Sequence, residues 1–221
     1  MVFSKSLLHG RYVLNLGASV RSALPTWAAL AAFLLMPLRA NASGLTAGET
    51  QRLLRGETVV RAQSLQRGDH RYVGGVTYTV VDANADAVAD TLGDVDAWRR
   101  ILPRTRSARR AGTSGEDALI ELTQGTALVQ ATYTIRMRRQ GRVVRFWLDP
   151  ERRHDIEDAW GFVRAAPMTD GRTLVTYGIL IDIGPGLLRD LFEDRVRELA
   201  LSVPERVRGL MLERITQNRP R

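Results

Sequence analysis

One strand followed directly by two short helices is the feature that most constrains the fold of this chain. Residues 76–81 place apolar and threonine side chains in alternation, the period of two that is typical of a half-buried strand. The side-chain oxygens of Asn84 and Asp94 then suit helix caps, and they predict helices over 85–92 and 95–102. Any sheet that the rest of the chain forms must accommodate this order of one strand followed by two short helices.

The rest of the chain supplies more strands and one long helix. Apolar residues recur every three or four positions over 186–216, which predicts a long amphipathic helix that Pro204 should kink. We therefore expect an α+β fold, in which a curved antiparallel sheet of about six to seven strands wraps around the C-terminal helix. The strand-like runs are 57–64, 76–81, 105–111, 118–124, 127–139, 142–148, 158–166 and 172–183.

The N-terminal region has the pattern of a secretory signal. Residues 22–38 carry no charge, Arg21 precedes them, and residues 40–42 read Ala-Asn-Ala, the small-x-small pattern that signal peptidase accepts. We expect residues 1–42 to be removed, so that the mature chain begins at Ser43. An uncleaved membrane anchor is the alternative, and translation starting at Val20 would give a more compact signal.

The expected organisation after the signal is one domain of ordinary size. Residues 43–69 form an N-terminal extension with a helix at 47–55 and a strand, 70–217 form the domain, and 218–221 form a tail. Loss of the signal lowers the formal net charge from +8 to +4, since it contains four basic residues and no acidic one. The chain has no cysteine, which excludes disulfides, thiol nucleophiles and cysteine metal sites.

The sequence resembles the START-like superfamily (SRPBCC) of polyketide cyclase/dehydrase and lipid transport proteins, which share a helix-grip fold. Within it, the chain looks closest to coenzyme Q-binding and cyclase-like bacterial members. The resemblance covers about residues 57–213. It rests on the strand 76–81, the turn 82–86, the run 94–103, the strand that contains Gly161, the turn 170–173 and the terminal helix.

The resemblance implies a hydrophobic cavity between the sheet and the C-terminal helix, used for lipids, quinones, isoprenoids or polyketides. A concave apolar pocket with a few polar groups is also the usual form of a small-molecule site. Each candidate wall residue has plain core packing as its alternative explanation. The candidates are Trp98, Tyr133, Ile135, Phe146, Tyr177, Ile179, Leu188 and Phe192.

The sequence assigns no catalytic residue. His70 and His154 lie beside turn signals among charged residues, which indicates surface positions more than a general base. Asp182 lies in an apolar run, where strand alternation places it on the outer face of the sheet. Nucleophile-elbow, phosphate-loop and zinc-protease motifs are absent from the sequence, and we predict no metal and no cofactor.

Arginine dominates the basic residues, since Lys5 is the only lysine among 32. Two arginine-rich stretches would suit anionic lipid headgroups, although an ordinary solvated face explains them as well. We do not expect nucleic acid as a partner, because neither stretch has interleaved aromatic residues. The first stretch contains Arg99, Arg100, Arg104, Arg106, Arg109 and Arg110, and the second contains Arg136, Arg138, Arg139, Arg142 and Arg145.

Three functions remain open. The first is an exported binder or carrier of a hydrophobic small molecule, favoured because export separates the protein from cytoplasmic polyketide assembly. The second is a polyketide cyclase- or dehydratase-like enzyme that uses the same cavity. The third is a scaffold that binds a partner protein and no ligand. Sequence alone predicts neither the ligand nor the oligomeric state.

Overall fold

A computed structural model describes residues 44–127, 129–185 and 187–217, with the backbone only for residues 187–192. The predicted signal at 1–42, the alternative start at Val20 and the tail at 218–221 lie outside the described residues. None of the helices in the described ranges is long and apolar enough to cross a membrane.

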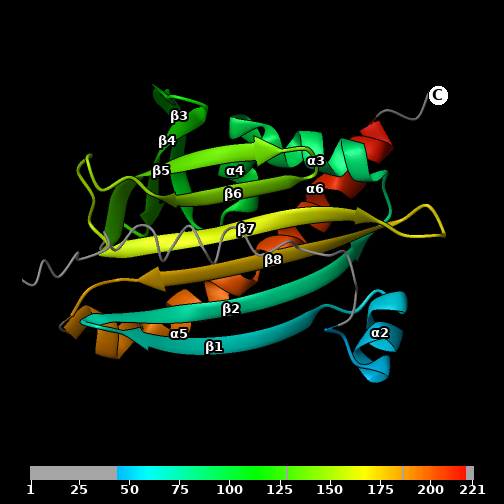
Figure 1. Ribbon diagram of the computed structural model, residues 1–221, viewed down its shortest axis with the longest axis horizontal. Coiled ribbons are helices and arrows are strands. Elements are labelled where there is room, and N and C mark those ends of the chain that lie inside the picture. Colours follow the sequence, from blue (N-terminus) through cyan, green and yellow to red (C-terminus); the bar gives the residue numbers. More distant parts are fainter. Residues whose placement is uncertain (1–43, 128, 186, 218–221) are drawn as a thin grey trace, which may run out of the picture. The chain divides into compact units, whose positions relative to one another are not determined.

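The elements follow the predicted order closely (Figure 1). The Asn84 and Asp94 side chains cap the second and third helices, as their sequence positions predict. The Thr46 hydroxyl caps the first helix, a cap that the sequence analysis did not single out. The elements are α2 (Ala47–Leu54), β1 (Val59–Arg67), β2 (His70–Val81), α3 (Ala85–Gly93), α4 (Val95–Ile101), β3 (Thr105–Ser114), β4 (Asp117–Gly125), β5 (Gln130–Gln140), β6 (Val143–Leu148), β7 (Asp158–Pro167), β8 (Thr173–Asp182), α5 (Leu187–Leu201) and α6 (Val203–Gln217).

In the described part of the chain, eight strands form one antiparallel sheet in the order β1-β2-β8-β7-β6-β5-β4-β3. The strands from β3 to β8 pair with their neighbours along the chain, and β2 pairs with β8. The sheet is larger than the six to seven strands predicted. The reason is that β1, which was expected in an N-terminal extension, belongs to the sheet. The chain turns at Gly68 after β1, and β1 pairs along its whole length with β2.

Strand β2 begins at His70, whereas the alternation predicted a start at Val76. Gly74 and Gly75 break the apolar pattern, yet both are paired within the strand, at φ values of 152° and 143° that favour glycine. A Cβ atom at Gly74 would lie 2.0 Å from the carbonyl oxygen of Ile179, and one at Gly75 would lie 2.0 Å from that of Arg61. The two glycines therefore let β2 approach both neighbouring strands closely.

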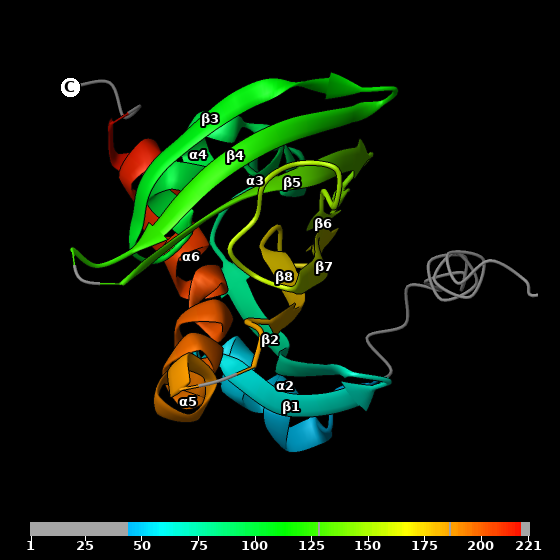
Figure 2. The ribbon, with the colours of Figure 1, turned by 90° about the vertical axis from the view of Figure 1, so that its left-hand side faces the viewer.

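The C-terminal helices lie along the concave side of the curved sheet (Figure 2). Helices α5 and α6 pack on β2 and β8, while α4 packs on β3 and α6. The predicted kink is confirmed, because the helix is interrupted at Ser202, two residues before Pro204. The main core forms between helices and sheet and includes Trp98, Val175 and Val207.

Candidate ligand-binding cavity

A cavity of about 520 Å³ lies between the sheet, helix α4 and helix α5. Most of its wall is apolar or aromatic. Its size falls within the range of ordinary small-molecule sites. The apolar and aromatic wall residues are Trp98, Leu102, Pro103, Leu122, Val129, Ala131, Tyr133, Ile135, Phe146, Ile156, Ala159, Tyr177, Ile179, Ile181, Ile183, Val196, Leu199, Ala200 and Val203.

The structure places six of the eight sequence candidates on this wall: Trp98, Tyr133, Ile135, Phe146, Tyr177 and Ile179. They come from α4, β5, β6 and β8, and the sheet brings them together. The side chains of Leu188 and Phe192 lie outside the described residues. Contact of any of these residues with a ligand stays a prediction.

Three aromatic side chains form the inner part of the wall. The rings of Trp98 and Phe146 meet edge to face, with centroids 5.4 Å apart and an interplanar angle of 82°. Phe146 also stacks on Tyr177 at 6.1 Å and 23°. The Trp98 indole nitrogen donates to the Leu92 carbonyl oxygen at 2.9 Å, which satisfies its only polar group. Aromatic packing and this hydrogen bond hold the inner wall in place.

A hydrogen-bonded polar group interrupts the apolar wall at Gln124, which sequence analysis did not single out. The Tyr133 hydroxyl donates to Gln124 Oε1. In turn, Gln124 Nε2 lies 2.9 Å from the Pro103 carbonyl oxygen and 3.2 Å from Thr105 Oγ1. The signal was present in the sequence, because the alternation that puts Ile120 and Leu122 inward puts Gln124 on the same face.

Tyr177 carries the other deeply placed hydroxyl of the wall. Only 3% of this residue is exposed, and its hydroxyl has no hydrogen-bond partner among the described residues. Burial raises the pKa of the Tyr177 phenol far above its ordinary value of 10.0, and the nearby Tyr133 phenol adds to the rise. The pKa of Tyr133 is raised by burial as well. Both side chains therefore stay neutral at physiological pH.

Exposed wall residues mark the mouth of the cavity. They come from the α4–β3 turn, the β4–β5 loop, the β6–β7 connection and α5, and Figure 1 shows the β4–β5 loop and α5 at the same end of the sheet. The mouth contains three charged side chains, so it differs in chemistry from the inner wall. The exposed residues are Arg104, Thr126, Val129, Gln130, Asp155 and Arg195.

Arg104 has an unusual backbone at this mouth. Its φ of 53° makes it the one described non-glycine residue in the left-handed region. Such a conformation costs roughly 1–2 kcal/mol for most residues, and retained strain of this kind often marks functional positions. The Arg104 carbonyl oxygen accepts a 3.0 Å hydrogen bond from the Gly125 N–H, which links the α4–β3 turn to the β4–β5 loop.

The C-terminal helix supplies wall residues that sequence analysis placed on its apolar face without assigning them to the cavity. Val196, Leu199 and Val203 follow the predicted spacing of three and four, and they line the cavity together with Ala200. The periodicity predicted which face is buried. It did not predict which turns of that face border the cavity and which pack in the core. That depends on how deeply the curved sheet encloses the helix.

Neither histidine of the domain lines the cavity, nor does Asp182. Its neighbours Ile181 and Ile183 line the cavity, so Asp182 lies on the opposite, outer face, as the alternation predicted, and even there it is only 2% exposed. Its carboxylate lies 3.1 Å from His70 Nδ1 and accepts hydrogen bonds from the backbone N–H groups of Arg71 and Gly184. His154 Nδ1 lies 2.7 Å from the Ile156 carbonyl oxygen. The described residues contain no cluster of three metal-ligating side chains.

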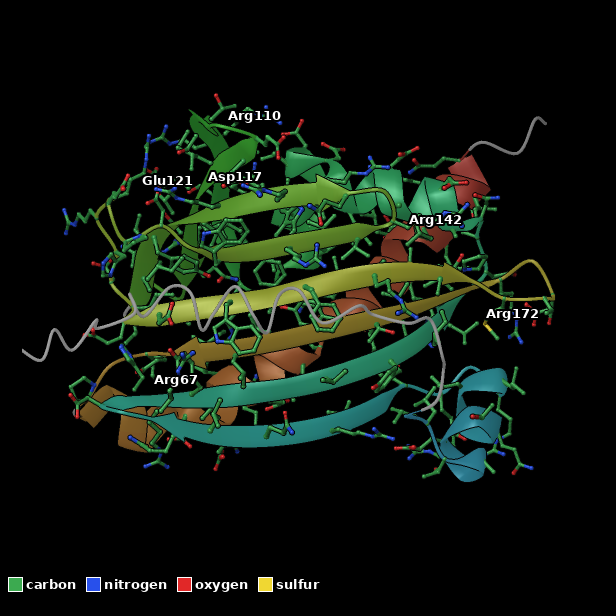
Figure 3. The ribbon with its side chains drawn as sticks, viewed as in Figure 1. Arg67, Arg110, Asp117, Glu121, Arg142 and Arg172 are labelled. Carbon is green, nitrogen blue, oxygen red and sulfur yellow. The ribbon has the colours of Figure 1, made fainter. Side chains whose placement is uncertain are left out.

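The second arginine-rich stretch is largely neutralised. Arg136 pairs with Asp149, Arg138 with Asp117, Arg139 with Asp90 and Arg142 with Asp86. Figure 3 shows Arg110 of the first stretch and Arg142 of the second well apart.

The first arginine-rich stretch is less paired. Arg100 and Arg109 pair with Glu213 and Glu121, whereas Arg99, Arg104, Arg106 and Arg110 form no ion pair within the described ranges. Arg104 belongs to the mouth of the cavity, so part of this uncompensated charge lies where a ligand would enter.

A curved antiparallel sheet closed around C-terminal helices, with two short helices after its first long strand, defines the START-like helix-grip fold. This chain has that fold. No family model and no curated protein matches the sequence.

Solved structures do match it. A STAR-related lipid transfer protein from Xanthomonas axonopodis has a TM-score of 0.55 at 17% identity, over 70% of this chain and 93% of that one. A protein from Thermus thermophilus has a TM-score of 0.54 at 14% identity, over 66% and 98%. A START superfamily protein from Mycobacterium smegmatis has a TM-score of 0.50 at 12% identity, over 62% and 96%. At these identities, the similarity establishes the fold alone.

Proposed function

We propose that this protein binds and carries a hydrophobic small molecule in the cavity between the sheet and the C-terminal helices. The observation that carries the proposal is the cavity itself, about 520 Å³ with a largely apolar wall and a polar mouth. Burial of apolar surface is worth roughly 25 cal/mol per Å², so a ligand that covers this wall gains affinity without any special motif. The predicted wall residues are the ones we assign to ligand contact.

We further propose that the protein acts outside the cytoplasm, as a mature chain that begins at Ser43. The uncharged segment 22–38 and the small residues at 40 and 42 support this part of the proposal. The mass and N-terminal sequence of the protein purified from its native host test it. A chain that retains residues 1–42 would contradict removal of the signal.

The second candidate is a cyclase- or dehydratase-like enzyme that uses the same cavity. Its supporting observation is the pair of buried phenols, Tyr133 and Tyr177, which could orient a reactive carbonyl chain. Against it, the described wall contains no histidine, and its one carboxylate, Asp155, is exposed at the mouth and accepts a hydrogen bond from the Thr132 N–H. A carrier needs none of these groups, so we favour carriage over catalysis.

We also propose contact with an anionic membrane surface, through the arginines at and near the mouth. Arg104 and Arg106 lack a carboxylate partner among the described residues, and Arg104 lies on the rim through which an apolar ligand would pass. Positively charged side chains close to an anionic surface gain roughly 1 kcal/mol each. A carrier that meets a membrane at its own cavity mouth could exchange ligand there.

Native purification followed by organic extraction and mass spectrometry tests the main proposal. A stoichiometric lipid, quinone or isoprenoid in the extract would support the carrier and identify its ligand class. A chemically altered product after incubation with a candidate ligand would favour the enzyme. An empty protein that also rejects the neutral fluorescent probe N-phenyl-1-naphthylamine would contradict ligand binding and favour the partner-binding scaffold.

A further inference from the structure

The inner wall of the cavity carries one polar group whose bonding is incomplete. The Tyr177 hydroxyl has no partner within the described residues, although 97% of the residue surface is covered. Among the described residues, the polar side-chain atoms that are fully enclosed and have no hydrogen-bond partner are Arg136 Nε and Arg197 Nε. The Tyr177 oxygen also lacks a partner but is not one of these atoms. It is therefore not fully enclosed and borders open space. Because Tyr177 lines the cavity, that space is the cavity.

None of the described polar groups near Tyr177 is hydrogen-bonded to its hydroxyl, and the bonds that these groups make lie elsewhere. The Trp98 indole donates to the Leu92 carbonyl oxygen, and the Tyr133 hydroxyl donates to Gln124. The Gln124 amide nitrogen is used by Pro103 and Thr105. The inner wall therefore offers a cavity ligand one uncommitted O–H donor.

An apolar ligand that filled this cavity without an oxygen would displace water from Tyr177 and leave the hydroxyl unsatisfied. An unmade hydrogen bond of a buried hydroxyl is unfavourable, and displacing an ordered water by a group that cannot replace its hydrogen bond weakens binding. Nearly all core tyrosine hydroxyls find a partner for this reason. Phenylalanine would serve better at this position if the cavity held only hydrocarbon.

We propose that Tyr177 donates a hydrogen bond to a carbonyl oxygen of the bound molecule, so that the ligand is an apolar compound carrying a ketone, quinone or ester carbonyl at the depth of the Phe146 ring. This inference rests on the proposed binding function and specifies its ligand class. A carbonyl oxygen only accepts, which matches a wall that offers a donor. Since burial keeps the Tyr177 phenol protonated, the donor persists over the physiological pH range.

Two probes of nearly equal shape test the proposal in the purified full-length protein. 2-Acetylnaphthalene has a carbonyl where 2-ethylnaphthalene has a methylene, and the affinity of each is measured by displacement of N-phenyl-1-naphthylamine. The wild-type protein should bind the ketone about fivefold more tightly than the hydrocarbon, the factor expected for one net hydrogen bond. The substitution Tyr177→Phe keeps the ring and should abolish this preference while leaving affinity for 2-ethylnaphthalene within about twofold.

The matched control is Tyr78→Phe. Tyr78 packs with α2 in a separate cluster and does not line the cavity, so its loss should leave the preference for the ketone intact. Equal affinity of the wild-type protein for both probes, or a preference that survives Tyr177→Phe, would overturn the carbonyl proposal while leaving the binding function standing. Failure of both probes and of the fluorescent reporter to bind would instead contradict the binding function itself.

Discussion

The Phe146 ring occupies the space that any side chain at Gly161 would need. These two residues face each other across β6 and β7, and a Cβ atom at position 161 would lie 2.6 Å from Phe146 Cζ and 2.4 Å from the Gly178 carbonyl oxygen. The same ring contacts Trp98 and Tyr177. Because Gly161 on β7 has no side chain, the Phe146 ring can take this position at the centre of the cavity wall.

The substitution Gly161→Ala should therefore destabilise the protein. The new methyl group must displace the Phe146 ring or the backbone of β8, and overpacking of this kind costs about 1–3 kcal/mol. Chemical denaturation monitored by circular dichroism measures the change. Gly209→Ala is the matched control, because Gly209 lies in α6 with open space at its Cβ position, and alanine there should stabilise by about 0.5–1 kcal/mol. Equal effects of the two substitutions would contradict the role of Gly161.

Filling the cavity should weaken ligand binding strongly without unfolding the protein. Ala200 lies on α5 and lines the cavity, so the ring introduced by Ala200→Phe can enter open space. We expect the affinity for N-phenyl-1-naphthylamine to fall by about tenfold or more, equivalent to about 1.4 kcal/mol, with little change in unfolding midpoint. Ala87→Phe is the control, since Ala87 is exposed on α3 and its replacement should leave probe binding unchanged. Unchanged probe binding in Ala200→Phe would show that the probe binds elsewhere.

Local order in this fold could be predicted because it depends on short-range chemistry. The caps at Asn84 and Asp94 and the break near Pro204 each follow from a side chain acting on its own backbone. The pairing of β2 with β8 could not be predicted in the same way. It joins residues about a hundred positions apart, such as Thr77 and Tyr177, through backbone groups that every residue has.

In the candidate site, too, some features could be predicted from the sequence and others could not. Strand alternation placed Tyr133, Ile135 and Phe146 on one apolar face, and the family resemblance implied that this face lines a cavity, as it does in the structure. The mouth was missed for two reasons. Arg104 lies in the α4–β3 turn, where no periodicity applies, and alternation placed Gln130 on the polar face of the predicted strand 127–139. For Arg104 the sequence left open an ordinary solvated surface or contact with lipid headgroups. Only the fold shows that the α4–β3 turn, the β4–β5 loop and α5 meet at the same opening.

The capping box of α2 should contribute stability that acid removes. Arg61 binds the Glu49 carboxylate through two nitrogen atoms at 2.9 and 2.6 Å, and the Thr46 backbone N–H donates to it at 2.7 Å. The Arg61 hydrogen bond, followed by that of Thr46, lowers the pKa of Glu49 from 4.5 to about 2. Since the unfolded chain then binds the proton more readily than the folded one, this contribution is complete above pH 4.5 and is lost as the pH falls toward 2.

An NMR titration of the Glu49 carboxyl group measures this pKa directly. In the variant Arg61→Met the pKa of Glu49 should rise toward 4.5, and in Glu49→Gln the unfolding free energy should depend less steeply on pH between 4.5 and 2 than in the wild type. A wild-type Glu49 that titrates near 4.5 would show that the ion pair does not persist in solution.

Arginines at the cavity mouth should control binding to anionic membranes. Replacing Arg104 and Arg106 together by glutamine removes two charges with no carboxylate partner in the described residues, and at about 1 kcal/mol each this predicts roughly thirtyfold weaker binding to phosphatidylglycerol vesicles. Sedimentation with vesicles at low salt measures the effect, and raising the salt should weaken wild-type binding.

The matched control for the mouth arginines is the double replacement of Arg139 and Arg142 by glutamine. It changes the net charge by the same amount, but these arginines pair with Asp90 and Asp86 at 2.6 Å. Since their charge is locally compensated, their loss should weaken vesicle binding much less. Equal losses for the two double variants would mean that net charge alone drives adsorption. Wild-type protein that does not sediment with anionic vesicles would contradict the membrane proposal and leave the cavity to load from solution or from a partner.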